Sequence, residues 1–199
     1  MSQPILTCVN VKKSGKLIGS DGFCICSYDM PDEMPIDEFL LPASMAQQVT
    51  KLEPTHIAEG QGWIHFKSKK GTILSCRTFV EKYPNIESLL KVKGLTIPFP
   101  KSTKEALERA SVFSKRDRVT DEEVVITMED KKMKIKSTSN TGWFEEKLNV
   151  RYSGDSISFS ITPYLLMAIL DKTENCILGE TTILFYGENW HYVARLRNV

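Results

Sequence analysis

The sequence predicts an α+β fold in which antiparallel sheets carry helices on one face, and it predicts this arrangement twice along the chain. Three observations support the prediction. Short stretches alternate apolar and polar residues, as half-buried strands do. Helical patterns follow a proline at the end of such a stretch. Matching segments recur in the same order at an offset of roughly 120 residues, which is about the length of a small domain.

The stretch NVRYSGDSISFSITPYLLMAIL, residues 149–170, shows the strand and the helix together. Ser-Gly-Asp at 153–155 is typical of a turn. Apolar residues then alternate with serine over 156–161, which is the period of a strand with one buried face. Thr162 suits a helix N-cap and Pro163 is tolerated at the first helical position, so a helix is predicted to follow them.

Three segments of the first half of the chain match three segments of the second half in order. The pairs are residues 8–21 with 125–139, 38–52 with 159–173, and 62–79 with 181–196. The first and third pairs resemble β-hairpins, and the second resembles a strand, a proline and a helix. A constant order at nearly one offset indicates a duplication, because a chance likeness would not keep its register through a whole unit.

The second copy contains a helix that the first copy lacks. In FPKSTKEALERASVFSKRD, residues 99–117, the apolar residues Ala106, Leu107 and Ala110 recur at helical spacing. Ser102 and Glu105 have the spacing of a capping box. The counterpart of this helix in the first copy would fall before residue 1. We therefore expect a chain that is truncated at its N-terminus or a first unit that is incomplete.

The duplication predicts two domains, over residues 1–92 and 93–199, of which the first lacks its first helix. Residues 81–94, EKYPNIESLLKVKG, carry a proline, a short apolar run and then charge, and they are interpreted as the connector.

Composition indicates a globular chain of ordinary polarity. The chain has 199 residues, of which 41% are hydrophobic and 26% charged, and its formal net charge is +1. This balance neither indicates nor excludes a nucleic-acid binder with positive charge on one face. No apolar run approaches 18 residues and the N-terminus does not resemble a signal peptide, so no membrane partner is expected. The five cysteines are irregularly spaced, which favours reduced thiols in a cytoplasmic protein.

Catalytic patterns are weak in this sequence. His56, His65 and His191 lie far apart and suggest no nucleophile–base constellation. Neither a P-loop nor a G-x-G-x-x-G pattern occurs. Cys24 and Cys26 share a strand face but lack a second pair of ligands, so no metal site and no cofactor are expected. The acidic segment PDEMPIDE, residues 31–38, has loop composition.

Several segments resemble one known family. LIGSDGFCICS (residues 17–27), EKYPNIESLL (81–90), LNVRYSGDSISFSITPYLLMAIL (148–170) and WHYVARL (190–196) resemble, in order, a strand, the connector, the last domain and the C-terminal strand of the bacterial DNA polymerase III β subunit, the sliding clamp. The resemblance runs from about residue 4 to 197. It implies duplicated DNA-clamp domains with sheets outside and helices on the inner face. A phage-like or truncated form that covers two domains would fit this length.

The resemblance implies a non-catalytic processivity factor that forms a homo-oligomeric ring around duplex DNA and binds phosphates without reading the sequence. Glu105 and Glu108 share the predicted helix with its cations and weaken this interpretation. The side chains expected to face DNA are Lys51, Lys101, Lys104, Arg109, Lys115, Arg116 and Lys172.

The resemblance also implies a pocket between domains that binds short linear motifs of DNA polymerase and the clamp loader. The residues carried over to this pocket are Ser20, Gly22, Phe23, Ile25, Pro84, Ser88, Leu89, Thr182, Val193, Arg195 and Leu196. The sequence departs from the family where Phe23-Cys24 follow Asp-Gly and at its C-terminal end, which favours an altered partner specificity. Phe23, Ile25 and Leu89 are alternatively core residues, as buried apolar side chains usually are.

Two other functions stay open at this point. A non-ring adaptor that keeps the clamp fold would not need the missing helix, whereas ring closure needs complete subunit edges. An unrelated α+β enzyme is disfavoured because no catalytic constellation is evident.

Overall fold

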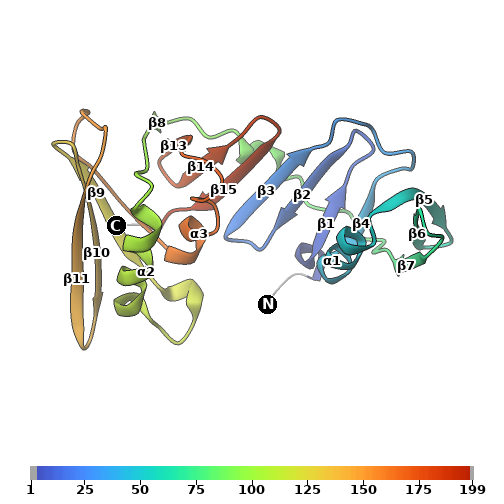
Figure 1. Cartoon of the computed structure of the whole chain (residues 1–199), viewed down its shortest axis with the longest axis horizontal. Coiled ribbons are helices and arrows are strands. Elements are labelled where there is room, and N and C mark those ends of the chain that lie inside the picture. The colour runs from blue at the N-terminus through green and yellow to red at the C-terminus, as the bar shows by residue number, and fades with distance from the viewer. Residues whose placement is uncertain (1–3, 198–199) are drawn as a thin grey trace. The chain divides into compact units, whose positions relative to one another are not determined.

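The computed structural model describes residues 4–197. The chain divides into two compact units, residues 1–88 and 89–199, which are called the first and the second unit below. Both are built from antiparallel strands with few helices (Figure 1). The predicted α+β class is therefore confirmed. The identity of the units as clamp domains that meet after residue 92 stays a prediction.

The first unit contains two antiparallel sheets and one α-helix within its described residues. In chain order its elements are the 3-10 helix η1 (Pro4–Thr7), β1 (Cys8–Val11), β2 (Lys16–Ser20), β3 (Cys24–Asp29), β4 (Phe39–Pro42), α1 (Ala43–Leu52), β5 (Pro54–Gly60), β6 (Trp63–Ser68) and β7 (Ile73–Arg77). One sheet has the strand order β4-β1-β2-β3 and the other the order β5-β6-β7. The 3-10 helix η2 (Glu87–Leu90) follows where the two units join.

The second unit has the same kinds of element and two more. They are β8 (Leu95–Thr96), α2 (Thr103–Ser114), the 3-10 helix η3 (Val119–Asp121), β9 (Val124–Glu129), β10 (Lys132–Ser139), β11 (Gly142–Asn149), β12 (Ile157–Ile161), α3 (Pro163–Met167), β13 (Cys176–Leu178), β14 (Thr182–Tyr186) and β15 (Trp190–Arg195). Its strands are ordered β11-β10-β9-β12 in one sheet and β15-β14-β13-β8 in the other.

The order of elements shows what the units share. From β9 onward, the second unit has three strands, then a strand, a helix and three strands, and the first unit has this same series from β1 onward. The second unit begins with β8 and α2, which have no counterpart among the described residues of the first unit.

The core of the second unit lies between α2 and the sheet beneath it. β9 and β10 pair Met128 with Met133, which places both side chains on one face, and both are fully buried. On α2, Leu107 and Ala110 are also fully buried. The small alanine lets the helix backbone approach the strands closely, so that methionine and leucine fill the remaining space at core density.

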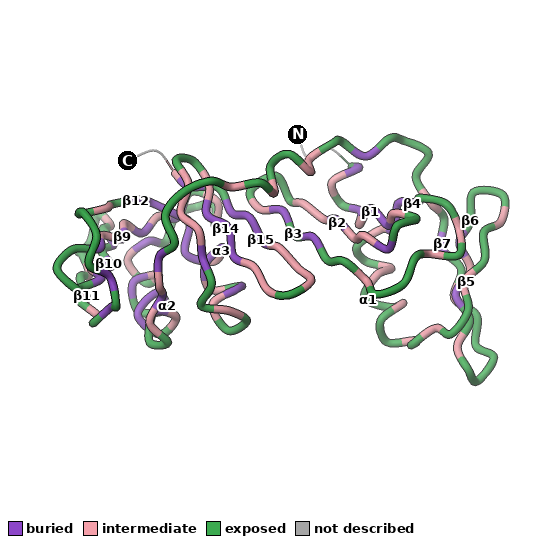
Figure 2. The backbone as a smooth tube through the Cα atoms, turned by 90° about the horizontal axis from the view of Figure 1, so that it is seen from above, coloured by how far each residue is buried: buried purple, intermediate pink, exposed green. Residues whose placement is uncertain are grey.

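The core of the first unit is less completely covered. A cluster of buried side chains joins β1, β4, β6 and β7, and it includes Val11, Phe39 and Phe66. None of the side chains on α1 is buried, whereas α2 contributes five buried residues. The tube of α1 is accordingly pink and green in Figure 2, while that of α2 contains purple positions.

Two local expectations about the helices are corrected. Ser102 occupies the N-cap position of α2 but makes no side-chain capping bond, so the capping box with Glu105 does not form. α3 ends at Met167, and the chain continues in hydrogen-bonded turns through Lys172 instead of a longer helix.

Candidate functional site

The cations expected to face DNA lie on α2, on its flanks and after α3, except Lys51, which is exposed in the last turn of α1 in the first unit. A lysine in that turn is favourable beside the C-terminal end of the helix dipole. Lys101 and Lys172 are exposed and border the same hollow of about 420 Å³ in the second unit. The structure therefore brings these two lysines together, although Asp171 and Glu174 border the hollow too.

Two of the cations on α2 are paired with carboxylates of the same unit. Arg109 binds Glu146 on β11 in a bidentate pair, with N–O distances of 2.9 and 2.7 Å. Lys104 donates a hydrogen bond to Asp171, and this bond raises the pKa of Lys104. Both cations are thus charged but partly neutralised before any ligand arrives. Such exposed pairs are weak, so a phosphate can replace the carboxylate.

The cations at the C-terminal end of α2 are also held by the protein. Lys115 Nζ lies 3.0 Å from Glu122 Oε1, and only 4% of the Glu122 side chain is exposed. Arg116 donates one hydrogen bond to its neighbour's carbonyl and a second, of 2.8 Å, to the carbonyl of Thr138. These contacts fix the direction of both side chains. That they face DNA stays a prediction.

The candidate peptide-binding residues of the first unit form the turn between β2 and β3. The Asp21 carboxylate accepts hydrogen bonds of 2.8 Å from the backbone N–H groups of Phe23 and Cys24. Gly22 has a φ of +87°, which favours glycine because it has no Cβ. The turn holds the ring of Phe23 39% exposed at its tip, while Ile25 is 8% exposed and belongs to the core.

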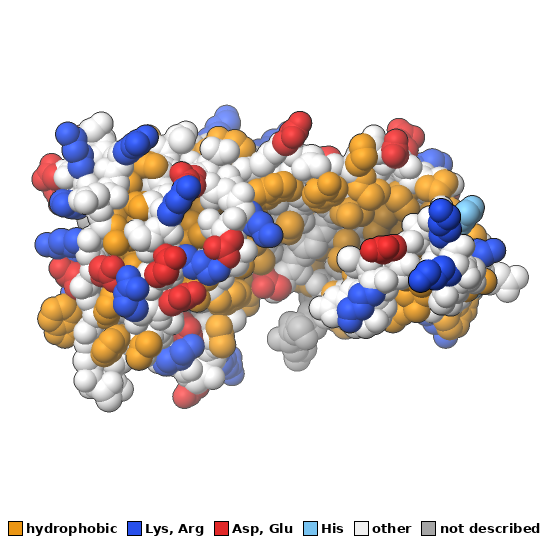
Figure 3. Space-filling model, viewed as in Figure 1, with side chains coloured by type: hydrophobic (Ala, Val, Ile, Leu, Met, Phe, Trp, Pro, Cys, Tyr) orange, Lys and Arg blue, Asp and Glu red, His pale blue; other side chains and the backbone are white. Residues whose placement is uncertain are grey.

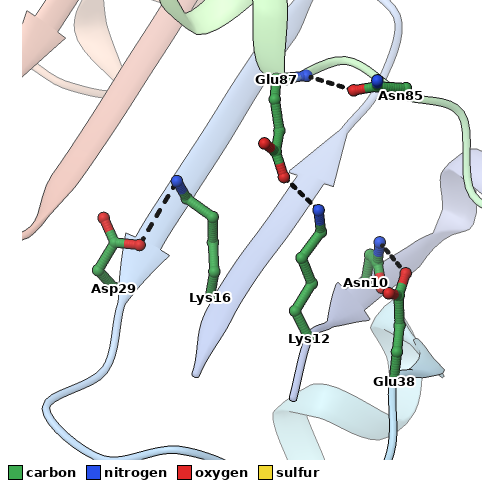
Figure 4. A network of polar contacts seen from close by, with 7 residues as sticks. All are labelled: Asn10, Lys12, Lys16, Asp29, Glu38, Asn85 and Glu87. Carbon is green, nitrogen blue, oxygen red and sulfur yellow. Dashed lines mark hydrogen bonds and ion pairs between the residues drawn. The ribbon is translucent and has the colours of Figure 1, made fainter. Parts of the chain in front are cut away.

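The connector is anchored on the first unit by a buried ring and an ion pair. Tyr83 is 6% exposed, and its burial raises the pKa of its hydroxyl group. Lys12 pairs with Glu87, and the backbone N–H of Glu87 donates to Asn85 (Figure 4). Figure 4 also shows the neighbouring pairs Asn10 with Glu38 and Lys16 with Asp29. The candidates on this anchored segment, Pro84, Ser88 and Leu89, are all exposed.

The candidates of the second unit divide by burial. Arg195 on β15 is exposed and lies opposite Thr182 on β14, which is half-buried. Val193 and Leu196 are 3% and 6% exposed. Buried side chains such as these can support a binding surface but cannot contact a peptide without rearrangement. That the candidates of the two units form one pocket stays a prediction.

Sequence reasoning missed several residues that organise these regions. Asp21 shapes the β2–β3 turn, and an aspartate before glycine is a recognised turn signal that could have indicated it. Glu122 and Arg197 were missed too. Arg197 donates a hydrogen bond of 2.6 Å to the carbonyl of Thr120, 77 residues away, and no sequence pattern reports such a contact.

Metal and membrane features were sought among residues 4–197. No group of three or more histidine, cysteine, aspartate or glutamate side chains there is placed to hold a metal ion. No helix within those residues has both the length and the apolar character needed to cross a membrane.

Known structures share this fold. A scan of protein-family models found no match, and a search of curated proteins also found none. The DNA polymerase III subunit beta from Pseudomonas aeruginosa matches 100% of the chain with a TM-score of 0.83 and 18% identity. A sliding clamp from Bartonella birtlesii bound to griselimycin matches 98% with a TM-score of 0.85 and 14% identity. The chain spans 61% and 59% of these two proteins, respectively. It therefore has the fold of a sliding clamp over about three fifths of a clamp's length.

Proposed function

We propose that the chain is a subunit of a DNA sliding clamp, a processivity factor that carries out no reaction of its own. The observation that carries the proposal is the fold likeness over 98% to 100% of the chain. In this proposal several copies form a ring around duplex DNA in the cytoplasm, and the ring tethers its partners to the DNA.

A ring retains DNA by topology, so its contacts with DNA need not be strong or sequence-specific. Lysine and arginine side chains meet phosphates, and these contacts weaken as salt rises. Lys101 and Lys172 support this role best, because both are exposed and form no ion pair with the rest of the described chain. Lys104, Arg109 and Lys115 must first exchange a carboxylate for a phosphate.

The proposed protein partners are DNA polymerase and a clamp loader, bound through short linear motifs. Exposed Phe23 and Leu89 supply apolar surface that suits leucine and phenylalanine anchors. Asp21 and the Lys12–Glu87 pair hold the segments that carry these two side chains, which reduces the ordering cost of binding.

A second candidate function is a non-ring adaptor that binds the same motifs without encircling DNA. The ion pairs of Lys104, Arg109 and Lys115 favour it, because they lower the positive charge that the helix α2 offers to phosphates.

Titration of a fluorescent peptide of the Gln-x-x-Leu-Phe type against the full chain tests the peptide-binding part of the proposal. Saturable binding that Leu89→Asp removes is expected, because this side chain is 55% exposed and apolar. Val112→Asp, at a 66% exposed position on α2, is the matched control and leaves binding unchanged. Absence of binding at about 1 mM, a limit of about 4 kcal/mol, would contradict the pocket as assigned.

A further inference from the structure

The first unit contains an apolar groove that its own described residues leave open. The groove has a volume of about 730 Å³ and lies between α1 and the faces of both sheets. Figure 3 shows hydrophobic side chains gathered over β1 to β4 at this part of the molecule. Lining residues from six elements include Val9, Leu17, Phe39, Ala46, Ile57 and Phe66.

Burial in α1 shows that this helix lacks a neighbour. Met45, Ala46, Val49 and Leu52 form an apolar stripe at helical spacing and pack against the core cluster, yet each stays partly exposed. An apolar stripe normally becomes buried against two surfaces, the sheet below and an element beside it. Here the sheet is present, and the element beside the stripe is absent from the described residues.

The second unit shows which element fills this place. There α2 packs on β9, β10 and β11 and against α3, which is the counterpart of α1. β8, which comes just before α2, pairs with the edge of β13. In the first unit the counterpart of β13 is β5, and within residues 4–197 that strand pairs only with β6. The open groove and the open strand edge thus correspond to one continuous segment, a strand followed by a helix.

We propose that this groove is a docking site for a strand–helix segment of another polypeptide, whose helix is amphipathic and basic. The apolar lining fits an alanine- and leucine-rich helix face like that of α2. The charge follows from the rim, where Asp32, Glu33 and Glu53 flank lining residues, are exposed, and form no ion pair with described residues. In the second unit the corresponding helix is likewise held by cations that pair with surrounding carboxylates.

The inference is independent of whether the chain encircles DNA, and a peptide added to the full chain tests it. The probe is a labelled synthetic peptide with the sequence of residues 94–116, which comprises β8 and α2. Saturable binding below about 1 mM is expected, together with slower hydrogen exchange of the α1 and β5 amides in the complex. A control peptide with Leu107→Asp keeps the basic residues and does not bind.

Two matched variants of α1 locate the binding site. Ala46→Arg places a charged side chain in the groove lining and weakens binding at least about tenfold, whereas Gln47→Arg, on the exposed neighbouring position, changes it less than about twofold. Equal effects of the two variants, binding of the control peptide, or unchanged exchange of α1 would overturn the proposal. A chain that self-associates and protects α1 without the peptide would assign the groove to a second copy and overturn it as well.

Discussion

Replacing Leu107 by alanine removes the side chain that most completely joins α2 to its sheet. Leu107 is fully buried, as are Met128 and Met133 on the facing strands. The change deletes three carbon groups, and at about 0.8 kcal/mol for each the transfer cost is about 2.4 kcal/mol. The cavity left in a well-packed core adds to this cost, so we expect the second unit to lose about 3–4 kcal/mol of unfolding free energy.

Native-state hydrogen exchange measures this loss within each unit separately, which matters because a chain of two units need not unfold in one step. About 3 kcal/mol corresponds to roughly a hundredfold faster exchange of the β9 and β10 amides. The β1 and β2 amides serve as an internal control and should keep their rates.

The matched control is Val112→Ala, on the same helix but at a 66% exposed position. Surface changes of this kind alter stability by less than about 0.5 kcal/mol. If Leu107→Ala accelerated exchange in the second unit no more than Val112→Ala does, the reasoning that α2 seals that unit would be refuted.

Three further predictions follow from close contacts and buried groups. A Cβ at Gly94 would lie 1.8 Å from the carbonyl oxygen of Leu178, so Gly94→Ala should destabilise the second unit by about 1–3 kcal/mol, and unchanged exchange at β13 would refute this. Burial raises the pKa of the Cys176 thiol, so iodoacetamide at pH 8 should modify it only after denaturant is added, as mass spectrometry would show. The hydrogen bond from Lys13 lowers the pKa of Asp37, so the stabilisation by this pair is present above the unfolded-state pKa of the carboxyl group and is lost as pH falls through its folded-state pKa. Lys13→Met should therefore raise the pKa of Asp37 in an NMR titration, and no change would contradict the assigned cause.

Local patterns predicted the main elements well where the pattern was strong. The helix expected over 102–114 is observed as α2 (Thr103–Ser114), because its apolar residues recur at helical spacing and small side chains let it pack closely. α3 was predicted too long, because the apolar run after Met167 continues as turns that periodicity alone cannot distinguish from a helix.

The candidate site was less predictable because its contacts are distant in sequence. Arg109 meets Glu146 across 37 residues, and Lys104 meets Asp171 across 67. The helix pattern indicated the cations, but only the folded sheet places a carboxylate beside each one. The resemblance to sliding clamps pointed to the fold that the known structures share, and the role of each site residue stays a prediction.

The proposal that the chain belongs to a ring is tested most directly by retention on circular DNA. The full chain is incubated with a singly nicked circular plasmid, and bound protein is separated by gel filtration before and after one restriction cut. A sliding clamp should co-elute with the circle at a salt concentration that disrupts ordinary phosphate contacts, and it should be released when the DNA becomes linear. Equal retention on circular and linear DNA, or no retention on either, would contradict the proposed function.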